Sequence, residues 1–413
     1  MPVYLLGTLD TKGTEIGYVR DLLRGFGVAV RVVDTGCLGE PTLTADISRE
    51  AVFEAAGESL AEVRRADNRG RAVTLASIGA ARIVSEAHAH GDVTGVLALG
   101  GSAGTNIGTS AMRALPLGVP KLMVSTLASG QTRPYVGSKD ILMLNAVVDI
   151  AGLNRISRTV LGNAARAMSG MVRHQSSMQV ETDGRDRPMI AATMFGVTTP
   201  CVERARQILE LAGYEVLVFH ATGTGGEAME GLIADGLFAG VLDITTTELA
   251  DELVGGILTA GPTRLTAAGR RGTPQVISVG ALDMVNFGGI QPTTGLPEGA
   301  TEKFRDRQFY RHNATVTLMR TAPDENRQLG EEIGQKAAAA TGPTSIMLPL
   351  LGISAIDKMG QPFDDPDART ALFEGIRATH GNVELVELDH HINDASFAEA
   401  AANKLLALIR EMI

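Results

Sequence analysis

The stretch that decides the expected fold is LLGTLDTKGTEIGYVRDLLRGFGVAVRVVD, residues 5–34. Its apolar start predicts a buried strand, the residues up to Arg24 predict a helix, and the β-branched run from Val28 predicts a second strand. Gly25 stands where the helix should end, because glycine accepts the backbone conformation of a helix C-cap. A strand, a helix and a strand in this order predict a βαβ unit with two parallel strands.

The same pattern returns in the second half of the chain, in residues 191–220. Gly213 and Val216 follow Gly25 and Val28 at one offset of 188 residues. Two similar openings predict two α/β domains of similar plan. Further apolar strands are expected at residues 93–99, 121–125, 240–244, 275–279, 345–348 and 383–388.

We therefore expect an α/β protein with two Rossmann-like parallel-sheet domains and an interdomain cleft. The expected domains are residues 1–183 and 184–413, joined by a polar linker at 174–188. Two helix starts have recognisable caps. The run Thr245-Thr246-Thr247-Glu248 predicts a capping box, and Asp394 predicts the cap of a C-terminal helix.

Composition excludes several classes of protein. The chain has 413 residues, 44% of them hydrophobic, and its net charge of −10 argues against a general nucleic-acid binder. No apolar run approaches the ~20 residues of a membrane span, so no membrane partner is expected. Two cysteines give no disulfide framework. Because the start lacks a signal-peptide pattern, we expect a cytoplasmic metabolic protein with a small-molecule ligand, and for a metabolic protein of this size we expect a homodimer.

The loop after the first strand, from Gly7 to Gly13, has the ingredients of an anion site. Thr8 and Lys12 offer a hydroxyl and an ammonium at a helix start, where backbone amides also point outward. A P-loop needs Gly-Lys-Thr, whereas the order here is Lys-Gly-Thr. The alternative is that Asp10 and Lys12 are solvated loop charges.

The loop GGSAGT after the third strand, residues 100–105, is the strongest phosphate-loop candidate, because its glycines allow close backbone approach. Tight strand–helix packing would need glycine as well. Asp34 ends the second strand and could accept hydrogen bonds from a ribose or cap a helix. The candidate nucleotide-binding residues are Gly7, Thr8, Lys12, Gly13, Asp34, Gly100, Gly101, Ser102, Gly104, Thr105, Ser125 and Thr126.

Polar loops also follow the strands expected in the second half, which predicts a second small-molecule site that includes Thr222. His220, Asp243, Asp283 and His391 form a possible catalytic or divalent-metal set, although no paired-histidine motif supports it.

Cys201 is a further candidate for the second half. It stands at a helix start, where the helix dipole would lower the pKa of its thiol, and His220 could act as its base. A buried, unreactive thiol is the alternative.

Long motifs carry a resemblance to a known family. They are GTLDTKG (7–13), GGSAGT (100–105), MRALPLGVPK (112–121), YVG (135–137), TMFGVT (193–198), FHATG (219–223) and DMVNF (283–287). The sequence resembles the ATP-binding family named after the tomato mosaic virus resistance protein, nearly from end to end. The resemblance implies a two-domain α/β architecture with ATP bound on the N-terminal domain; it implies no catalytic residues.

These observations predict an ATP-binding metabolic protein, with Mg²⁺ accompanying the nucleotide and a separate small-molecule site in the C-terminal domain. One alternative is a metal-dependent lyase or hydrolase that uses the C-terminal His and Asp residues. Another is a nucleotide-gated interaction module without catalysis. The sequence names neither a substrate nor a reaction, so whether the protein is an enzyme stays open.

Overall fold

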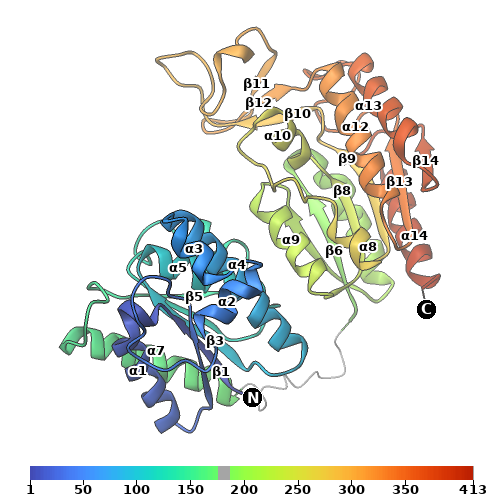
Figure 1. The fold of residues 1–413 in the computed structure, drawn as a ribbon. Helices are drawn as coiled ribbons and strands as arrows, with labels where there is room; N and C mark the ends of the chain where they lie inside the picture. Colours follow the sequence, from blue (N-terminus) through green and yellow to red (C-terminus); the bar gives the residue numbers. More distant parts are fainter. Residues whose placement is uncertain (175–186, 413) are drawn as a thin grey trace. The chain divides into compact units, whose positions relative to one another are not determined.

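The computed structural model describes residues 1–174 and 187–412, which belong to two compact units, Met1–Gly184 and Arg185–Ile413 (Figure 1). The predicted domain boundary lies one residue from this division. The predicted linker lies mostly outside the described residues. No helix among the described residues is long and apolar enough to cross a membrane.

The N-terminal unit is an α/β domain around one parallel sheet. Its strands are β1 (Val3–Gly7), β2 (Val30–Asp34), β3 (Gly95–Gly100), β4 (Lys121–Ser125) and β5 (Leu142–Asn145). Its helices are α1 (Leu9–Gly25), α2 (Arg49–Ala56), α3 (Leu60–Arg65), α4 (Arg69–Ala89), α5 (Ser102–Arg113), α6 (Arg133–Val136) and α7 (Arg155–His174).

The strand order of this sheet, β2-β1-β3-β4-β5, contains a switch point. From β1 the chain moves outward to β2 and then crosses back to β3 on the other side of β1, so the connections leave β1 in opposite directions. Val3 of β1 pairs with both Val30 and Gly95. Ligands of open α/β sheets bind at such a point, beyond the carboxyl ends of the strands.

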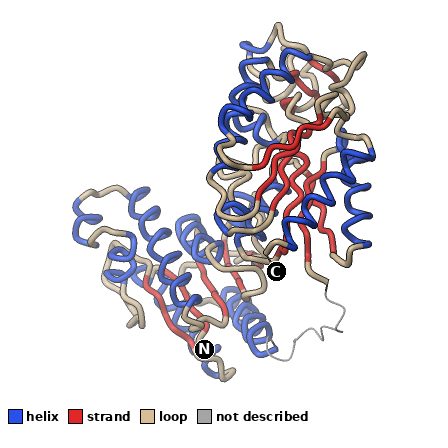
Figure 2. Tube along the Cα trace, turned by 90° about the vertical axis from the view of Figure 1, so that its right-hand side faces the viewer, coloured by secondary structure: helices blue, strands red, loops and turns tan. Residues whose placement is uncertain are grey.

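Helices cover both faces of the N-terminal sheet (Figure 2). Tyr4 and Leu6 pack in an apolar cluster with α4 and α5, whereas Val3 and Leu5 pack with α1 and α7. Successive side chains of a strand point to opposite faces. A strand covered on both faces is therefore apolar throughout, as the VYLLG sequence of β1 is.

The C-terminal unit has a larger parallel sheet and a small antiparallel one. Its strands are β6 (Met189–Met194), β7 (Glu215–His220), β8 (Phe238–Thr245), β9 (Gln275–Gly280), β10 (Met284–Phe287), β11 (Phe309–Arg311), β12 (Thr317–Arg320), β13 (Thr344–Pro349) and β14 (Glu384–Leu388). Its helices are α8 (Thr199–Leu211), α9 (Thr224–Ala234), α10 (Glu248–Val254), α11 (Ala267–Arg271), α12 (Pro323–Ala338), α13 (Pro366–Thr379) and α14 (Ala395–Arg410), with short 3₁₀ turns at Gly196–Thr198 and Glu302–Phe304.

The parallel sheet has the order β14-β13-β9-β8-β6-β7, with its switch point between β6 and β8. Two parallel-sheet α/β domains are therefore confirmed. No strand range expected above lies in the antiparallel sheet β10-β12-β11; of its three strands, the sequence indicates only β12, through the strand-like run at residues 314–319. It follows β9 along the chain, so it is an insertion at the carboxyl edge of the parallel sheet.

Both predicted caps mark the right helix starts but work differently. Thr247 occupies the N-cap of α10 without a side-chain cap hydrogen bond, and Glu248 is the first residue of the helix, where it accepts from Gly223 N at 2.7 Å. The predicted capping box is therefore wrong. Asp394 is the N-cap residue of α14, but its side chain accepts from His391 N at 2.8 Å and not from the helix.

Candidate functional site

A cavity of about 480 Å³ lies at the carboxyl ends of the N-terminal strands. It is lined by the loops that follow β1, β2 and β3, on either side of the switch point, and by the α3–α4 segment. This volume lies within the range of small-molecule sites, roughly 300–1,000 Å³. The predicted residues that line it are Thr8, Lys12, Gly100, Gly101, Ser102 and Gly104.

Two helices start at this cavity. The N-cap residues Thr8 of α1 and Gly101 of α5 make no side-chain cap hydrogen bond. The first backbone N–H groups of α5, on Ser102, Ala103 and Gly104, have no acceptor in the described chain. Since such groups carry the positive end of a helix dipole, they are ready donors for an anion.

The charged lining of the cavity is balanced. Lys12 and Arg64 line it, but each already donates within the chain. Lys12 Nζ bonds to Ile150 O, and Arg64 donates to Cys37 O at 2.8 Å and to Leu38 O at 3.3 Å. Arg69 adds a third cation, and the three carboxylates of the lining oppose the three cations. These carboxylates belong to Asp10, Asp67 and Asp149.

Asp10 is distinct among these carboxylates. Its Oδ2 accepts from Leu38 N at 2.9 Å, whereas its Oδ1 is shielded from solvent and has no partner in the described chain. An added Cβ on Gly36 would lie 2.6 Å from Oδ1, so the oxygen sits in a space that only glycine leaves open. A buried acceptor without a donor is costly. Mg²⁺ favours carboxylate oxygens, so the residues present fit a divalent cation here.

Part of the cavity lining is aliphatic. Val63 comes from α3, Ala72, Val73 and Ala76 come from α4, and Ile107 comes from α5. These aliphatic side chains can take the uncharged part of a ligand by burial, without aromatic stacking. Sequence reasoning missed this wall, because α3 and α4 carry no motif and are distant from the glycine loops along the chain.

Two of the predicted glycines pack against other chain segments and do not line the cavity. A Cβ on Gly7 would lie 2.6 Å from the end of Ile16, and one on Gly13 would lie 2.1 Å from Thr42 Oγ1. Both glycines therefore serve close packing of α1 against its surroundings.

The prediction that Asp34 meets a ribose needs correction. Its Oδ1 accepts from Leu9 N at 3.0 Å and Gly36 N at 2.9 Å, and its Oδ2 pairs with Arg49 Nε at 2.9 Å. With the residue only 2% exposed, both oxygens are committed to the chain. Asp34 instead fixes the start of α1, which is the helix-cap alternative.

The predicted hydroxyls behind the glycine loop form a buried pair. Thr105 Oγ1 and Ser125 Oγ are 2.6 Å apart, and Ser125 Oγ also accepts from Leu127 N at 2.9 Å. Thr126 Oγ1 lies 3.7 Å from where a Cβ of Gly101 would stand. These residues support the loop from behind and lie outside the cavity lining.

A second cavity of about 420 Å³ is lined mainly by β2 and the segment that follows it. Asp34, Thr44, Ser48 and Arg49 contribute to it, and Arg64 lines both cavities. Arg49 Nη2 is buried and has no partner among the described residues.

In the C-terminal unit, Asp243 is held by a buried arginine. Arg264 donates to Asp243 Oδ1 at 2.7 Å and to Oδ2 at 2.5 Å, and its Nε donates to Glu248 Oε2 at 2.6 Å. Thr193 adds a bond to Asp243 Oδ1 at 2.7 Å. Burial alone would lower the pKa of Arg264, but Asp243, Glu248 and Glu230 together raise it well above its usual value. An internal ion pair therefore fills this switch point.

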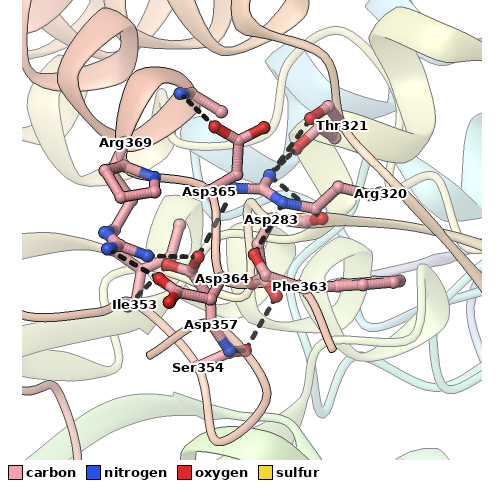
Figure 3. A network of polar contacts seen from close by, with 12 residues as sticks. Asp283, Arg320, Thr321, Ile353, Ser354, Asp357, Phe363, Asp364, Asp365 and Arg369 are labelled. Atoms are coloured by element: carbon pink, nitrogen blue, oxygen red, sulfur yellow. Dashed lines mark hydrogen bonds and ion pairs between the residues drawn. The ribbon is translucent and has the colours of Figure 1, made fainter. Parts of the chain in front are cut away.

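Asp283 lies in a separate network at the carboxyl ends of β9 and β13 (Figure 3). Ser354 Oγ donates to Asp283 Oδ2 at 2.8 Å, and Asp283 Oδ1 is buried without a partner in the described chain. Arg369 Nη1 donates to Asp357 Oδ1 at 2.7 Å, and Arg320 Nη2 lies 3.4 Å from the same oxygen. Burial, reinforced by Asp357, raises the pKa of Asp283.

His391 joins this network at one point. Its Nε2 lies 2.8 Å from Ser354 O, and its Nδ1 accepts from Asn393 N at 3.1 Å. His391 and Asp283 thus both contact Ser354, whereas Asp243 belongs to the Arg264 cluster. Within residues 1–174 and 187–412, no three His, Cys, Asp or Glu side chains form a metal site. The predicted metal set is therefore not assembled.

Cys201 follows the alternative of a buried thiol. Cys201 is fully buried in α8, and burial raises the pKa of its thiol to about 12. Burial disfavours the charged thiolate, which is the reactive form of a cysteine. His220 is an exposed residue at the end of β7, and Thr222 Oγ1 donates to its carbonyl oxygen at 3.4 Å.

The two units match the two domains of one known protein family. The N-terminal domain model of UPF0261, an uncharacterised protein family, matches residues 1–177, and the C-terminal domain model of the same family matches residues 187–409. The chain belongs to the UPF0261 family. This UPF0261 chain is 47% identical to a UPF0261 protein of Clostridium tetani over 411 residues, which cover 99% of each chain. It is 46% identical to one of Mesorhizobium japonicum, covering 97% of each.

The UPF0261 chain is also 40% identical to the ToMV resistance protein Tm-1(GCR237) of Solanum lycopersicum, over 98% of this chain and 55% of the tomato protein. The resemblance to the family of that protein is confirmed. A solved glycosyltransferase, SsfS6 of Streptomyces sp. SF2575, aligns with 67% of this chain and 81% of its own at 13% identity. Its TM-score of 0.17 establishes no shared fold.

Proposed function

We propose that the N-terminal unit of this UPF0261 protein binds ATP, accompanied by Mg²⁺, in the cavity at the β1–β3 switch point. The observation that carries the proposal is the start of α5, where three backbone N–H groups without acceptors in the described chain adjoin the cavity. A phosphate group satisfies such donors better than a neutral ligand, because the helix dipole adds a favourable field.

The remaining walls suit the other parts of a nucleotide. Lys12 brings a positive charge close to the phosphates, and the aliphatic wall from Val63 to Ile107 takes the base. The resemblance to an ATP-binding family, which implies ATP on the N-terminal domain, supports the proposal. The Mg²⁺ ion would supply positive charge between phosphate oxygens and the Asp10 carboxylate.

Isothermal titration calorimetry with ATP and MgCl₂ tests the proposal. Saturable binding of one ATP per chain is expected. Absence of binding at millimolar ATP, with magnesium present, would overturn it. Phosphate release measured in the same mixtures separates an ATP-consuming enzyme from a nucleotide-gated interaction module.

The proposal does not extend to a C-terminal metal-dependent lyase or hydrolase. Asp243 is committed to Arg264, and Asp283 and His391 are bonded to Ser354. We further propose a cytoplasmic homodimer, on the grounds of composition and size. Light scattering after gel filtration would give twice the chain mass of 43.3 kDa, and a monomer would contradict it.

A further inference from the structure

We infer that Asp10 makes the cavity selective for metal-bound nucleotide: its free Oδ1 binds the divalent cation that the nucleotide brings, and without that cation it repels the phosphates. This inference rests on the proposed function and adds the residue that decides which form of the nucleotide enters.

One oxygen of the Asp10 side chain is held by the chain and the other has no partner among the described residues. Asp10 lies in the first turn of α1, directly after β1, and Leu38 N fixes its Oδ2 at 2.9 Å. Its Oδ1 is the one carboxylate oxygen of the cavity lining that is buried and unpartnered among the described residues. Asp67 and Asp149 are exposed, so water satisfies their oxygens.

The cavity lining offers a polyphosphate no excess of positive charge. The cations of the lining are matched one for one by carboxylates, and Lys12 and Arg64 already donate to backbone carbonyls. A nucleotide triphosphate carries several negative charges into this balanced lining. An added divalent cation removes the repulsion, since a carboxylate and a phosphate can share it.

A metal ion at Asp10 would be shared between the protein and the nucleotide. No group of three acidic, His or Cys side chains holds a metal anywhere in the described chain, so a resident, protein-only cage is not what Asp10 belongs to. Mg²⁺ is commonly held by one or two carboxylates together with substrate phosphates and water. One orphaned oxygen beside a phosphate-binding helix start matches that arrangement.

The experiment is a crossed titration with a non-hydrolysable ATP analogue, in MgCl₂ and in EDTA, for the wild-type chain and Asp10→Asn. The asparagine keeps an oxygen to accept from Leu38 N, so the shape of the loop is preserved. Wild-type affinity should fall about tenfold or more in EDTA. Asp10→Asn should bind more weakly than wild type in MgCl₂ and as tightly or more tightly than wild type in EDTA.

A control variant sharpens the outcome. Asp21→Asn removes an exposed carboxylate from the same helix, outside the cavity lining. It should keep the wild-type response to magnesium. Loss of that response in Asp21→Asn, or equal weakening of Asp10→Asn in both buffers, would overturn the assignment of Asp10. Binding that is equally tight with and without magnesium in the wild type would overturn it as well. If no analogue binds in either buffer, the proposed function itself fails.

Discussion

Arg264 and Asp243 form a two-pronged ion pair in the interior of the C-terminal unit, with Nη2–Oδ1 and Nη1–Oδ2 distances of 2.7 and 2.5 Å. Arg264 is 0% exposed and Asp243 is 1% exposed. The pair lies at the carboxyl end of β8, where an α/β sheet commonly binds its ligand. In this unit the chain supplies its own cation at that position.

Removing the arginine should therefore destabilise the fold. Arg264→Ala leaves Asp243 and Glu248 buried without their cation, and the expected loss is about 3–5 kcal/mol in the free energy of unfolding. Denaturant unfolding measures it. Arg204→Ala is the matched control, because its pair with Glu399 is exposed and should contribute at most about 1 kcal/mol. Equal losses in the two variants would contradict the structural role of the buried pair.

Two neighbouring glycines should separate binding from stability. A Cβ on Gly101 would meet only Thr126 Oγ1, at 3.7 Å, so Gly101→Val should fold while its side chain blocks the start of α5. A Cβ on Gly100 would lie 2.8 Å from the Gly104 backbone, so Gly100→Ala should cost roughly 1–3 kcal/mol of stability. Calorimetric ATP binding and thermal unfolding of each variant test this. Unchanged ATP affinity in Gly101→Val would remove the loop from the site.

Cys37 provides a chemical test of the same cavity. It is half-buried in the lining, whereas Cys201 is fully buried, so an alkylating reagent should modify the folded chain only at Cys37. Burial, reinforced by Asp10, raises the pKa of the Cys37 thiol, so the reaction needs mildly alkaline pH. ATP at ten times its Kd should slow alkylation about tenfold, because only unoccupied protein reacts. A rate that ATP does not change would contradict a ligand in this cavity, and Cys37→Ser should show no labelling.

The buried Asp251 should make stability depend on pH. Burial raises the pKa of Asp251 to about 7, although Asn286 and Leu258 donate hydrogen bonds to it. The folded state thus keeps a proton that the unfolded state releases near pH 4. The stabilising contribution is complete below about pH 4 and is lost as the pH rises through about 7.

Asp251→Asn isolates this contribution. The side-chain oxygen Oδ1 of Asn286 is buried without a partner in the described chain, so after a flip of that side-chain amide Oδ1 can accept from the new NH₂ group. Relative to the wild type, the variant should gain on the order of 1 kcal/mol or more between pH 5 and pH 8. Unfolding curves at the two pH values measure the difference. The same difference at both pH values would show that Asp251 does not titrate in this range.

The repeating apolar strands and glycine stops predicted the two sheets, because those patterns follow from burial on both faces of parallel strands. The glycine loop before α5 was predictable from local sequence, because an apolar strand followed by Gly100 and Gly101 is a pattern typical of a helix start. Asp10 lies within the motif of residues 7–13. Its proposed role in metal binding depends on Leu38 and Gly36, which only the fold brings next to it.

Contacts between segments that are distant along the chain explain why the predictions for Asp243, Glu248 and Cys201 differ from the structure. Asp243 was expected to be available for a ligand, but Arg264 reaches it from a loop with no recognisable motif. Glu248 has the spacing of a capping box, yet an ion pair with Arg264 outweighs one local hydrogen bond. Helix position alone suggested an activated Cys201, and only the packing of α8 reveals how completely it is desolvated.

The switch point between β1 and β3 also has a consequence for how the N-terminal unit is made. Val3 pairs with Gly95, so the centre of the sheet cannot close until about a quarter of the chain has left the ribosome. Until then β1 has only β2 as a partner, and one of its edges is open to other chains. Closing such a distant pair is slow compared with local helix formation. We therefore expect the cavity to be completed late in folding, after the helices that line it have formed.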